Sequence, residues 1–209
     1  MAKKSFPTLP PLVPGRGSKL SRAFYKKLFL AQGWQMAGEF PNLPKAVAII
    51  SPHTSNFDAW LGFNALLGLG IQITIFGKDS LFRTPLKPIL EWIGVVPVVR
   101  DTPQGQTKQI IDVIKKTDHI WVGMAPEGSR KAPEKIRSGF YHIAKAANLP
   151  IVMFSFDYDH KIIHILGVYH ITGDYDYDLE QIYKHYEGKI SAKNPEWIAK
   201  PLRKLVKKD

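Results

Sequence analysis

Strand-like apolar runs alternate with helix-like segments along most of this chain, and that alternation is the strongest constraint on its fold. The strand-like runs lie at residues 46–51, 71–76, 95–99, 119–124, 150–156 and 161–169. The helix-like segments lie at 56–68, 82–93, 103–117 and 138–147, with two more near 178–190 and 194–206. This order predicts a single-domain α/β sandwich with a central, mostly parallel sheet flanked by helices. Because only a short segment that contains Tyr158, Asp159 and His160 separates the last two runs, we expect an antiparallel hairpin there and hence a mixed sheet.

Both ends of the chain are basic. The net charge is +11, and no acidic residue precedes Glu39. Residues 1–17 predict an irregular N-terminal arm, because prolines interrupt them. Residues 18–37 predict a basic amphipathic helix, and 194–206 predict a basic C-terminal helix. In the first of these helices the apolar positions that recur at helical spacing are Leu20, Phe24, Leu28 and Ala31.

The basic ends have more than one interpretation. Such surfaces attract polyanions, either nucleic acid or an anionic membrane surface. A solvated face with frayed tails would give the same composition. The 18–37 helix can dock on the core, which is the more common arrangement, or lie in a membrane interface.

No transmembrane helix is predicted. Residues 59–77 carry no charge, and this length approaches the ~20 residues that a span requires. However, Gly62, Gly68 and Gly70 interrupt the stretch, so we interpret it as a helix, a glycine break and a buried strand. The start of the chain lacks the apolar core of a secretory signal. The absence of cysteine suits a reducing compartment, which favours a cytoplasmic location.

A histidine and an aspartate follow the first strand-like run. His53 and Asp58 are five positions apart, which on one continuous helix would separate their side chains by ~140°. They can meet only if His53 lies in a loop and Asp58 in the first turn of a helix that Ser55 caps. Asp58 would then fix the tautomer of a general base. A simple helix cap, with His53 as an ordinary loop residue, accounts for the same residues.

Charged residues follow other strands at the same expected sheet edge. The segment Ala125-Pro126-Glu127-Gly128-Ser129-Arg130-Lys131 comes directly after 119–124. Arg100 ends the run at 95–99, and Lys78 comes shortly after 71–76. Ligands of open α/β sheets bind at the carboxyl ends of the strands. A turn and a few surface cations would explain each of these segments singly, but their matching positions favour one shared site.

These blocks resemble the glycerolipid acyltransferases of the lysophosphatidate type. That family has His-x4-Asp, then a glycine, an apolar stretch and an arginine, then Phe-Pro-Glu-Gly-Thr-Arg, then a Val-Pro-Ile strand. The chain has the corresponding blocks in order: His53 to Asp58, Gly94 to Arg100, Ala125 to Arg130, and Leu149 to Val152. It differs in having Pro52 where asparagine is usual, Ala125 for the aromatic residue and Ser129 for threonine. The resemblance covers most of a catalytic domain at 18–209 and implies a glycerol-3-phosphate acyltransferase-like fold.

The resemblance also implies roles for individual residues. His53 would be the general base and Asp58 its partner. Arg100 and Arg130 would hold a phosphate, with Lys78 adding charge. Glu127 would accept hydrogen bonds from glycerol hydroxyls or shape the phosphate loop, together with Gly128 and Ser129. No metal and no cofactor is implied; acyl-CoA or acyl carrier protein would be the co-substrate.

The leading hypothesis is therefore a peripheral membrane acyltransferase. It would acylate a lysophospholipid, with 1-acylglycerol 3-phosphate as the first choice, at an anionic membrane surface. One alternative keeps the enzyme but changes the acceptor to another lysolipid, an amine or an alcohol. A second alternative is a non-catalytic module that binds anionic lipid or nucleic acid; the leading hypothesis involves no nucleic acid.

Overall fold

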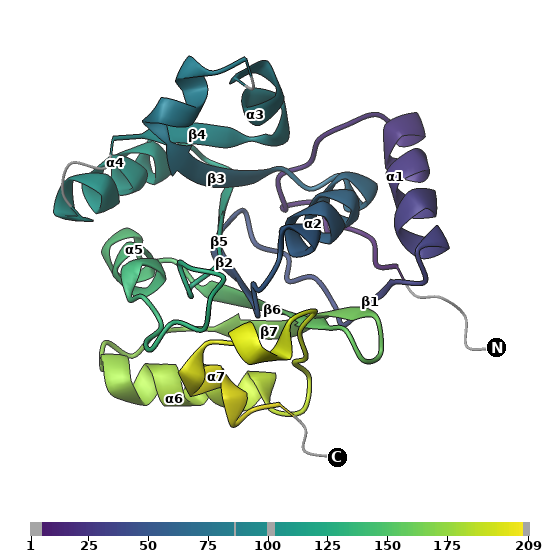
Figure 1. Ribbon diagram of the computed structural model, residues 1–209. Coiled ribbons are helices and arrows are strands. Elements are labelled where there is room, and N and C mark those ends of the chain that lie inside the picture. Colours follow the sequence, from purple (N-terminus) through teal and green to yellow (C-terminus); the bar gives the residue numbers. More distant parts are fainter. Residues whose placement is uncertain (1–5, 86, 100–102, 207–209) are drawn as a thin grey trace.

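Seven strands form one mixed sheet in the computed structural model, which describes residues 6–85, 87–99 and 103–206 (Figure 1). Their order across the sheet is β1-β7-β6-β2-β5-β3-β4, and every neighbouring pair is parallel except β6 and β7. Their bounds are β1 (Gln35–Ala37), β2 (Lys45–Ser51), β3 (Ile73–Lys78), β4 (Val95–Val98), β5 (Ile120–Met124), β6 (Ile151–Asp157) and β7 (Ile162–Tyr169). The predicted α/β class, the mostly parallel sheet and the final hairpin are confirmed.

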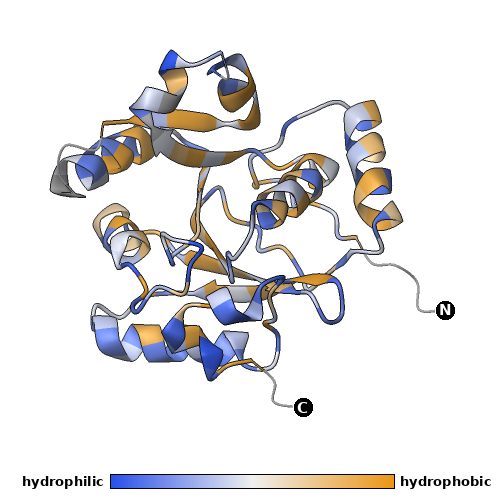
Figure 2. Cartoon of the chain, in the orientation of Figure 1, coloured by the Kyte–Doolittle hydropathy of each residue, from blue (hydrophilic) through white to orange (hydrophobic). Residues whose placement is uncertain are grey.

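Helices cover both faces of this sheet. On one face lie α1 (Lys19–Ala31) and α2 (Asn56–Leu69), and on the other lie α4 (Pro103–Lys115), α5 (Gly139–Ala147), α6 (Tyr175–Tyr186) and α7 (Lys200–Arg203). The short elements η1 (Asp79–Arg83) and α3 (Lys87–Ile93) lie beside β4, and η2 (Pro195–Trp197) precedes α7. In Figure 2 the strands are coloured mostly as apolar residues, whereas much of α6 and α7 is coloured as hydrophilic. The sheet therefore separates two apolar cores.

The central strand β2 contributes to both cores. Val47 and Ile49 pack into the core under α5, and Ala46 and Ala48 pack into the core under α2. A parallel strand that is buried on both faces is apolar at nearly every position rather than at alternate ones. The chain leaves β2 at its carboxyl end, and the loop at 52–55 that follows is the centre of the candidate site.

The first helix is shorter than the predicted 18–37. It ends at Ala31, and residues 35–37 form β1, which pairs with β7. Gly33 has a φ of +84°, a backbone conformation that ends a helix readily. The N-terminal residues 6–17 contain no helix, and one isolated bridge joins Gly15 to Ile71.

Two other predicted helices differ from the structure because of proline. The 82–93 segment divides into η1 and α3, with Pro85 between them. The 194–206 segment contains only η2 and α7, each with a proline in its first two positions. Proline lacks the N–H that a helix interior needs, so it starts short helices rather than extending a long one. The helix predicted at 178–190 runs instead from Tyr175, after the Asp174 N-cap, to Tyr186.

Candidate active site

The loop after β2 leads into α2 through a reciprocal helix cap. The Ser55 hydroxyl accepts hydrogen bonds from the backbone N–H of Phe57 at 3.0 Å and of Asp58 at 3.3 Å. In return, Asp58 Oδ2 accepts from the backbone N–H of Ser55 at 2.7 Å and of Thr54 at 2.6 Å. These bonds satisfy donors that a helix start otherwise leaves unpaired. They also fix Asp58 in the first turn of α2.

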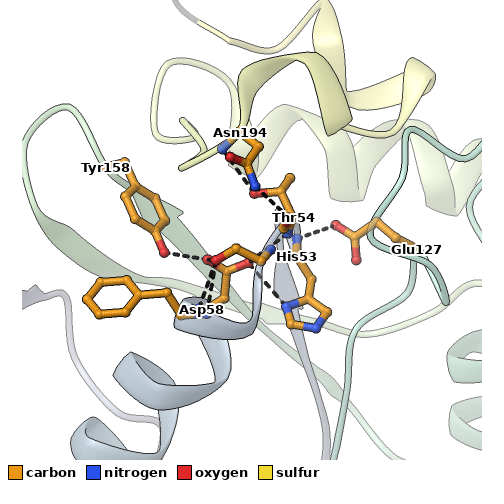
Figure 3. A network of polar contacts seen from close by, with 8 residues as sticks. His53, Thr54, Asp58, Glu127, Tyr158 and Asn194 are labelled. Carbon is orange, nitrogen blue, oxygen red and sulfur yellow. Dashed lines mark hydrogen bonds and ion pairs between the residues drawn. The ribbon is translucent and has the colours of Figure 1, made fainter.

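The same carboxylate faces His53. His53 Nδ1 lies 3.2 Å from Asp58 Oδ2, and Figure 3 shows the ring directed toward it. With its proton on Nδ1, the ring leaves Nε2 as the basic nitrogen. The His53 side chain is 27% exposed, whereas that of Asp58 is fully buried. Asp58 therefore both caps the helix and contacts His53.

The pKa of Asp58 lies below its usual value. Burial alone would raise this pKa, but hydrogen bonds from His53, Tyr158, Ser55 and Thr54 outweigh it. Asp58 is therefore a carboxylate near neutral pH. It can hold the imidazole by Nδ1 and stabilise the ring when it carries a positive charge.

Glu127 lies behind the His53 loop rather than open to solvent. Its Oε1 accepts a hydrogen bond from the backbone N–H of His53 at 3.3 Å, and its Oε2 has no hydrogen-bond partner among the described residues (Figure 3). Burial raises the pKa of Glu127 above its usual value. The Tyr186 hydroxyl, also buried, likewise has no partner in the described part of the chain. The buried position of Glu127 suits support of the His53 loop better than contact with a substrate.

The remaining residues of the predicted turn are exposed beside His53. Gly128, Ser129, Arg130 and Lys131 line one side of a cleft of about 880 Å³, and His53, Thr54 and Ser55 line another. Within the described ranges, no carboxylate pairs with the Arg130 guanidinium. The cleft therefore presents unpaired positive charge next to the histidine.

Gly128 has structural reasons to be glycine. Its φ is +62°, and a Cβ at this position would lie 2.3 Å from Arg137 Nε. Any side chain would strain the backbone and displace Arg137. The turn thus brings a further arginine, which the sequence did not point to, against the predicted phosphate loop.

Two other residues, Arg100 and Lys78, were also predicted to bind the phosphate. Arg100 lies outside the described residues. Lys78 is the last residue of β3, which is separated from β2 by β5, and its backbone aligns with Val98 of β4. The Lys78 side chain also lies outside the described part of the structure, so the roles of both residues stay predictions.

A second, apolar cavity also reaches His53. It has a volume of about 310 Å³ and lies between the sheet and α2. His53, Asp58 and Ala125 line it at the site. Its wall is apolar and includes Ala48, Gly62, Ala65, Leu69, Ile73 and Gly123. His53 and Ala125 line both this cavity and the polar cleft.

Two further residues support the site from distant parts of the sequence. The Tyr158 hydroxyl donates a hydrogen bond to Asp58 Oδ1, and the Asn194 side chain donates to the Thr54 carbonyl at 3.0 Å (Figure 3). Neither residue lies in a motif, so the sequence offered no signal for them. In the described part of the chain, no cluster of three or more acidic or histidine side chains could hold a metal ion.

Comparison with known proteins identifies the family. A family model described as Acyltransferase matches residues 39–157, which is more than half of the 209-residue chain. The chain belongs to the Acyltransferase family. The matched part of this acyltransferase includes the His53 loop and the turn at 125–131. The resemblance seen in the sequence is therefore confirmed at the level of the family.

A solved structure has a similar fold. The acyltransferase aligns with the 1-acyl-sn-glycerophosphate (LPA) acyltransferase PlsC from Thermotoga maritima with a TM-score of 0.52 and 16% sequence identity. The alignment covers 78% of this chain and 75% of PlsC. At this identity the similarity is one of fold. No curated protein sequence matches the chain. Across the described residues, none of the acyltransferase's helices combines the length and apolar character needed to cross a bilayer.

Proposed function

We propose that this protein transfers a fatty acyl group from an acyl thioester to the hydroxyl of a lysophospholipid. The observation that carries the proposal is the position of His53, which lines both an apolar cavity and a cleft with unpaired positive charge. An acyl chain suits the first space and an anionic headgroup the second. The reacting carbonyl and hydroxyl would then meet at the histidine, where a general base is needed.

The reaction can be written with the residues present. His53 Nε2 removes the proton from the acceptor hydroxyl as its oxygen attacks the thioester carbonyl carbon. The C–O bond forms, and the tetrahedral intermediate then breaks its C–S bond. The thiolate leaves and takes the proton back from the imidazolium, so that His53 is regenerated. Asp58 holds Nδ1 throughout and stabilises the charged ring.

The acceptor proposed first is 1-acylglycerol 3-phosphate. Arg130 can bind a phosphate through two parallel hydrogen bonds, and the exposed Ser129 hydroxyl lies on the same turn. We also assign Arg100 and Lys78 to this phosphate from their places in the motifs. Glu127, which is buried against the His53 backbone, is assigned to shaping the loop. The thioester carrier is either coenzyme A or acyl carrier protein.

An anionic membrane surface at the cytoplasmic side is the proposed partner. The predicted apolar stripe of α1 does not face the core: Leu20 is 82% exposed and Phe24 is 61% exposed. Exposed Lys19, Lys26 and Lys27 lie on the same helix. Apolar side chains among lysines suit insertion between anionic headgroups, where an amphiphilic substrate resides. The opposite face of α1 packs against α2, which forms part of the wall of the apolar cavity.

The central test is the His53→Ala variant, assayed with a long-chain acyl-CoA and lysophosphatidate. We expect kcat to fall by at least ~100-fold, since a general base contributes that much or more. His142→Ala is the matched control, because His142 is exposed on α5 and lies outside the site. Normal turnover by His53→Ala would reject the mechanism.

The acceptor requires a separate panel. Ala125, which lines both spaces, stands where the family motif has an aromatic residue, and this leaves more room at the junction. A wild-type enzyme that acylates another lysolipid, an amine or an alcohol faster than lysophosphatidate would retain the mechanism and change the acceptor. Salt-sensitive binding to vesicles or nucleic acid without acyl transfer to any acceptor would instead indicate a binding module.

A further inference from the structure

Tyr158 contacts the oxygen of Asp58 that faces away from His53. Asp58 Oδ2 accepts from His53, Thr54 and Ser55, whereas Oδ1 accepts from the Ser55 hydroxyl at 3.1 Å and from the Tyr158 hydroxyl. Tyr158 comes from the β6–β7 turn, 100 positions along the chain (Figure 3). Each oxygen of the carboxylate is thus held from a different side.

The turn that carries Tyr158 is itself well anchored. The Tyr158 ring packs edge-on against buried Trp34, with 4.9 Å between ring centroids. Asp157, also buried, accepts hydrogen bonds from the His160 N–H at 3.1 Å and from the Ser191 hydroxyl at 3.0 Å. A hydroxyl on a ring fixed in this way can hold its partner to a defined orientation.

We propose that Tyr158 is a positioning residue for the His53–Asp58 pair, and that its hydroxyl fixes the rotation of the Asp58 carboxylate so that Oδ2 faces His53. This inference rests on the proposed function, in which His53 is the base. Without the Tyr158 hydroxyl, the Ser55 hydroxyl is the remaining donor to Oδ1 among the described residues. The carboxylate can then turn, and its two oxygens compete for Nδ1.

The hydrogen bond from Tyr158 to Asp58 also affects the protonation of the His53–Asp58 pair. It is one of the interactions that lower the pKa of Asp58. The titratable groups that face Asp58 are His53 and Tyr158, and Glu127 faces the His53 backbone from the 125–131 turn. Removing a donor from Oδ1 makes the coupled pair more basic as a whole. The acid limb of the pH–rate profile, which reports this titration, moves to higher pH.

The test is Tyr158→Phe, which removes the hydroxyl and keeps the ring that packs on Trp34. We expect kcat to fall about tenfold, the size typical of a lost hydrogen bond to a charged group, with KM for both substrates unchanged and the acid limb at higher pH. Tyr169→Phe is the matched control: the Tyr169 hydroxyl donates to another carboxylate, that of Asp178, at 2.7 Å, away from the site. Tyr169→Phe leaves both kcat and the pH profile as in the wild type. A wild-type kcat and acid limb in Tyr158→Phe overturn the inference.

A readout without substrate separates this inference from the proposed function. The Asp58 carboxyl carbon is followed by NMR as a function of pH in the wild type and both variants. The midpoint pH of this titration is higher in Tyr158→Phe than in the wild type, and Tyr169→Phe leaves it unchanged. An unchanged midpoint overturns the positioning role even if the enzyme is active, whereas a shift in a protein without acyl transfer rejects the proposed function and leaves the contact established.

A second substitution, which preserves the fold, should move the acid limb and the Asp58 carboxyl midpoint in the opposite direction. With 3-fluorotyrosine placed at position 158, the hydroxyl is more acidic and a stronger donor. The acid limb and the carboxyl midpoint then move to lower pH. A shift in the same direction as in Tyr158→Phe overturns the inference.

Discussion

Two buried carboxyl groups lie on either side of His53, and their surroundings shift their pKa values in opposite directions. Asp58 accepts several hydrogen bonds, and its pKa is lowered; Glu127 has one oxygen without a partner among the described residues, and burial raises its pKa. Such divergence is typical of catalytic sites, where one group stays charged and another stays neutral. The proposed mechanism requires Asp58 to be ionised and does not require Glu127 to be.

Glu127→Gln tests this difference through stability. A carboxyl group whose folded pKa is raised above the usual 4.5 stabilises the fold below that pH, and this contribution is lost as pH rises through the raised pKa. Glutamine keeps an oxygen for the His53 N–H and cannot ionise. We therefore expect the free energy of unfolding of the variant, relative to the wild type, to increase as the pH rises above 4.5, as measured by urea denaturation.

Glu134→Gln is the control for this comparison, because Glu134 is an exposed carboxylate with a surface ion pair to Lys200. The difference in free energy of unfolding between Glu134→Gln and the wild type should vary little over the same pH range. A pH-independent difference for Glu127→Gln would show that burial does not perturb this group.

Among the elements, α1 buries only part of its apolar surface. Its face toward α2 includes Phe29, and the helices approach closely where a Cβ on Gly68 would lie 2.8 Å from Lys26 N. The face that carries Leu20 and Phe24 is left outside. Helical spacing identifies an apolar stripe, but it does not say whether protein or another apolar phase covers it.

Replacing Leu20 and Phe24 together by serine should weaken binding to vesicles that contain anionic lipid. Burial of each side chain is worth ~1.5–3 kcal/mol, so the partition coefficient should fall at least ~10-fold, as measured by sedimentation. Turnover of a water-soluble, short-chain substrate should not change. Tyr177→Ser, at an exposed aromatic position on α6, is the control. Equal binding by the double variant and the wild type would exclude α1 as the membrane contact.

The elements also show what the sequence can predict. The cap of α2 was predictable because Ser55 and Asp58 are three positions apart and interact locally. Tyr158 and Asn194 were not, because they reach the loop from 100 and 140 positions away. The three-residue β1 was missed for the same reason, since its pairing with β7 overrides the helical pattern around it. Interactions that depend on tertiary structure leave no periodic signal.

For the whole molecule, the sheet separates two apolar cores, and the apolar cavity lies on the α2 side. The core under α4, α5 and α6 is lined by large side chains such as Phe140, Tyr186 and Met153. On the other face, Ala48, Ala65 and Gly123 leave room beside His53. Both sides of the sheet are packed with apolar side chains, and the α2 side also leaves space for a ligand.

Gly62→Leu should shorten the acyl chain that the enzyme accepts. Gly62 lines the cavity from α2, and a Cβ there would meet its nearest neighbour, Phe156, at 4.0 Å, so a leucine can extend into the space. Because leucine also favours a helix by ~1 kcal/mol over glycine, thermal stability should not fall. Competition between long- and short-chain acyl-CoA measures the shift. Gly139→Leu, on α5 away from the cavity, is the control; an unchanged preference would place the acyl chain elsewhere.

The two faces of β2 have a consequence for how relatives of this enzyme could diverge. Val47 packs in the core under α5, so changes there are constrained by the stability of the fold. Ala48 lies on the face that holds the cavity and lines it, so an added methyl group there enters space that is partly empty. A lineage could therefore adjust its substrate range through Ala48, while the adjacent Val47 retains the architecture.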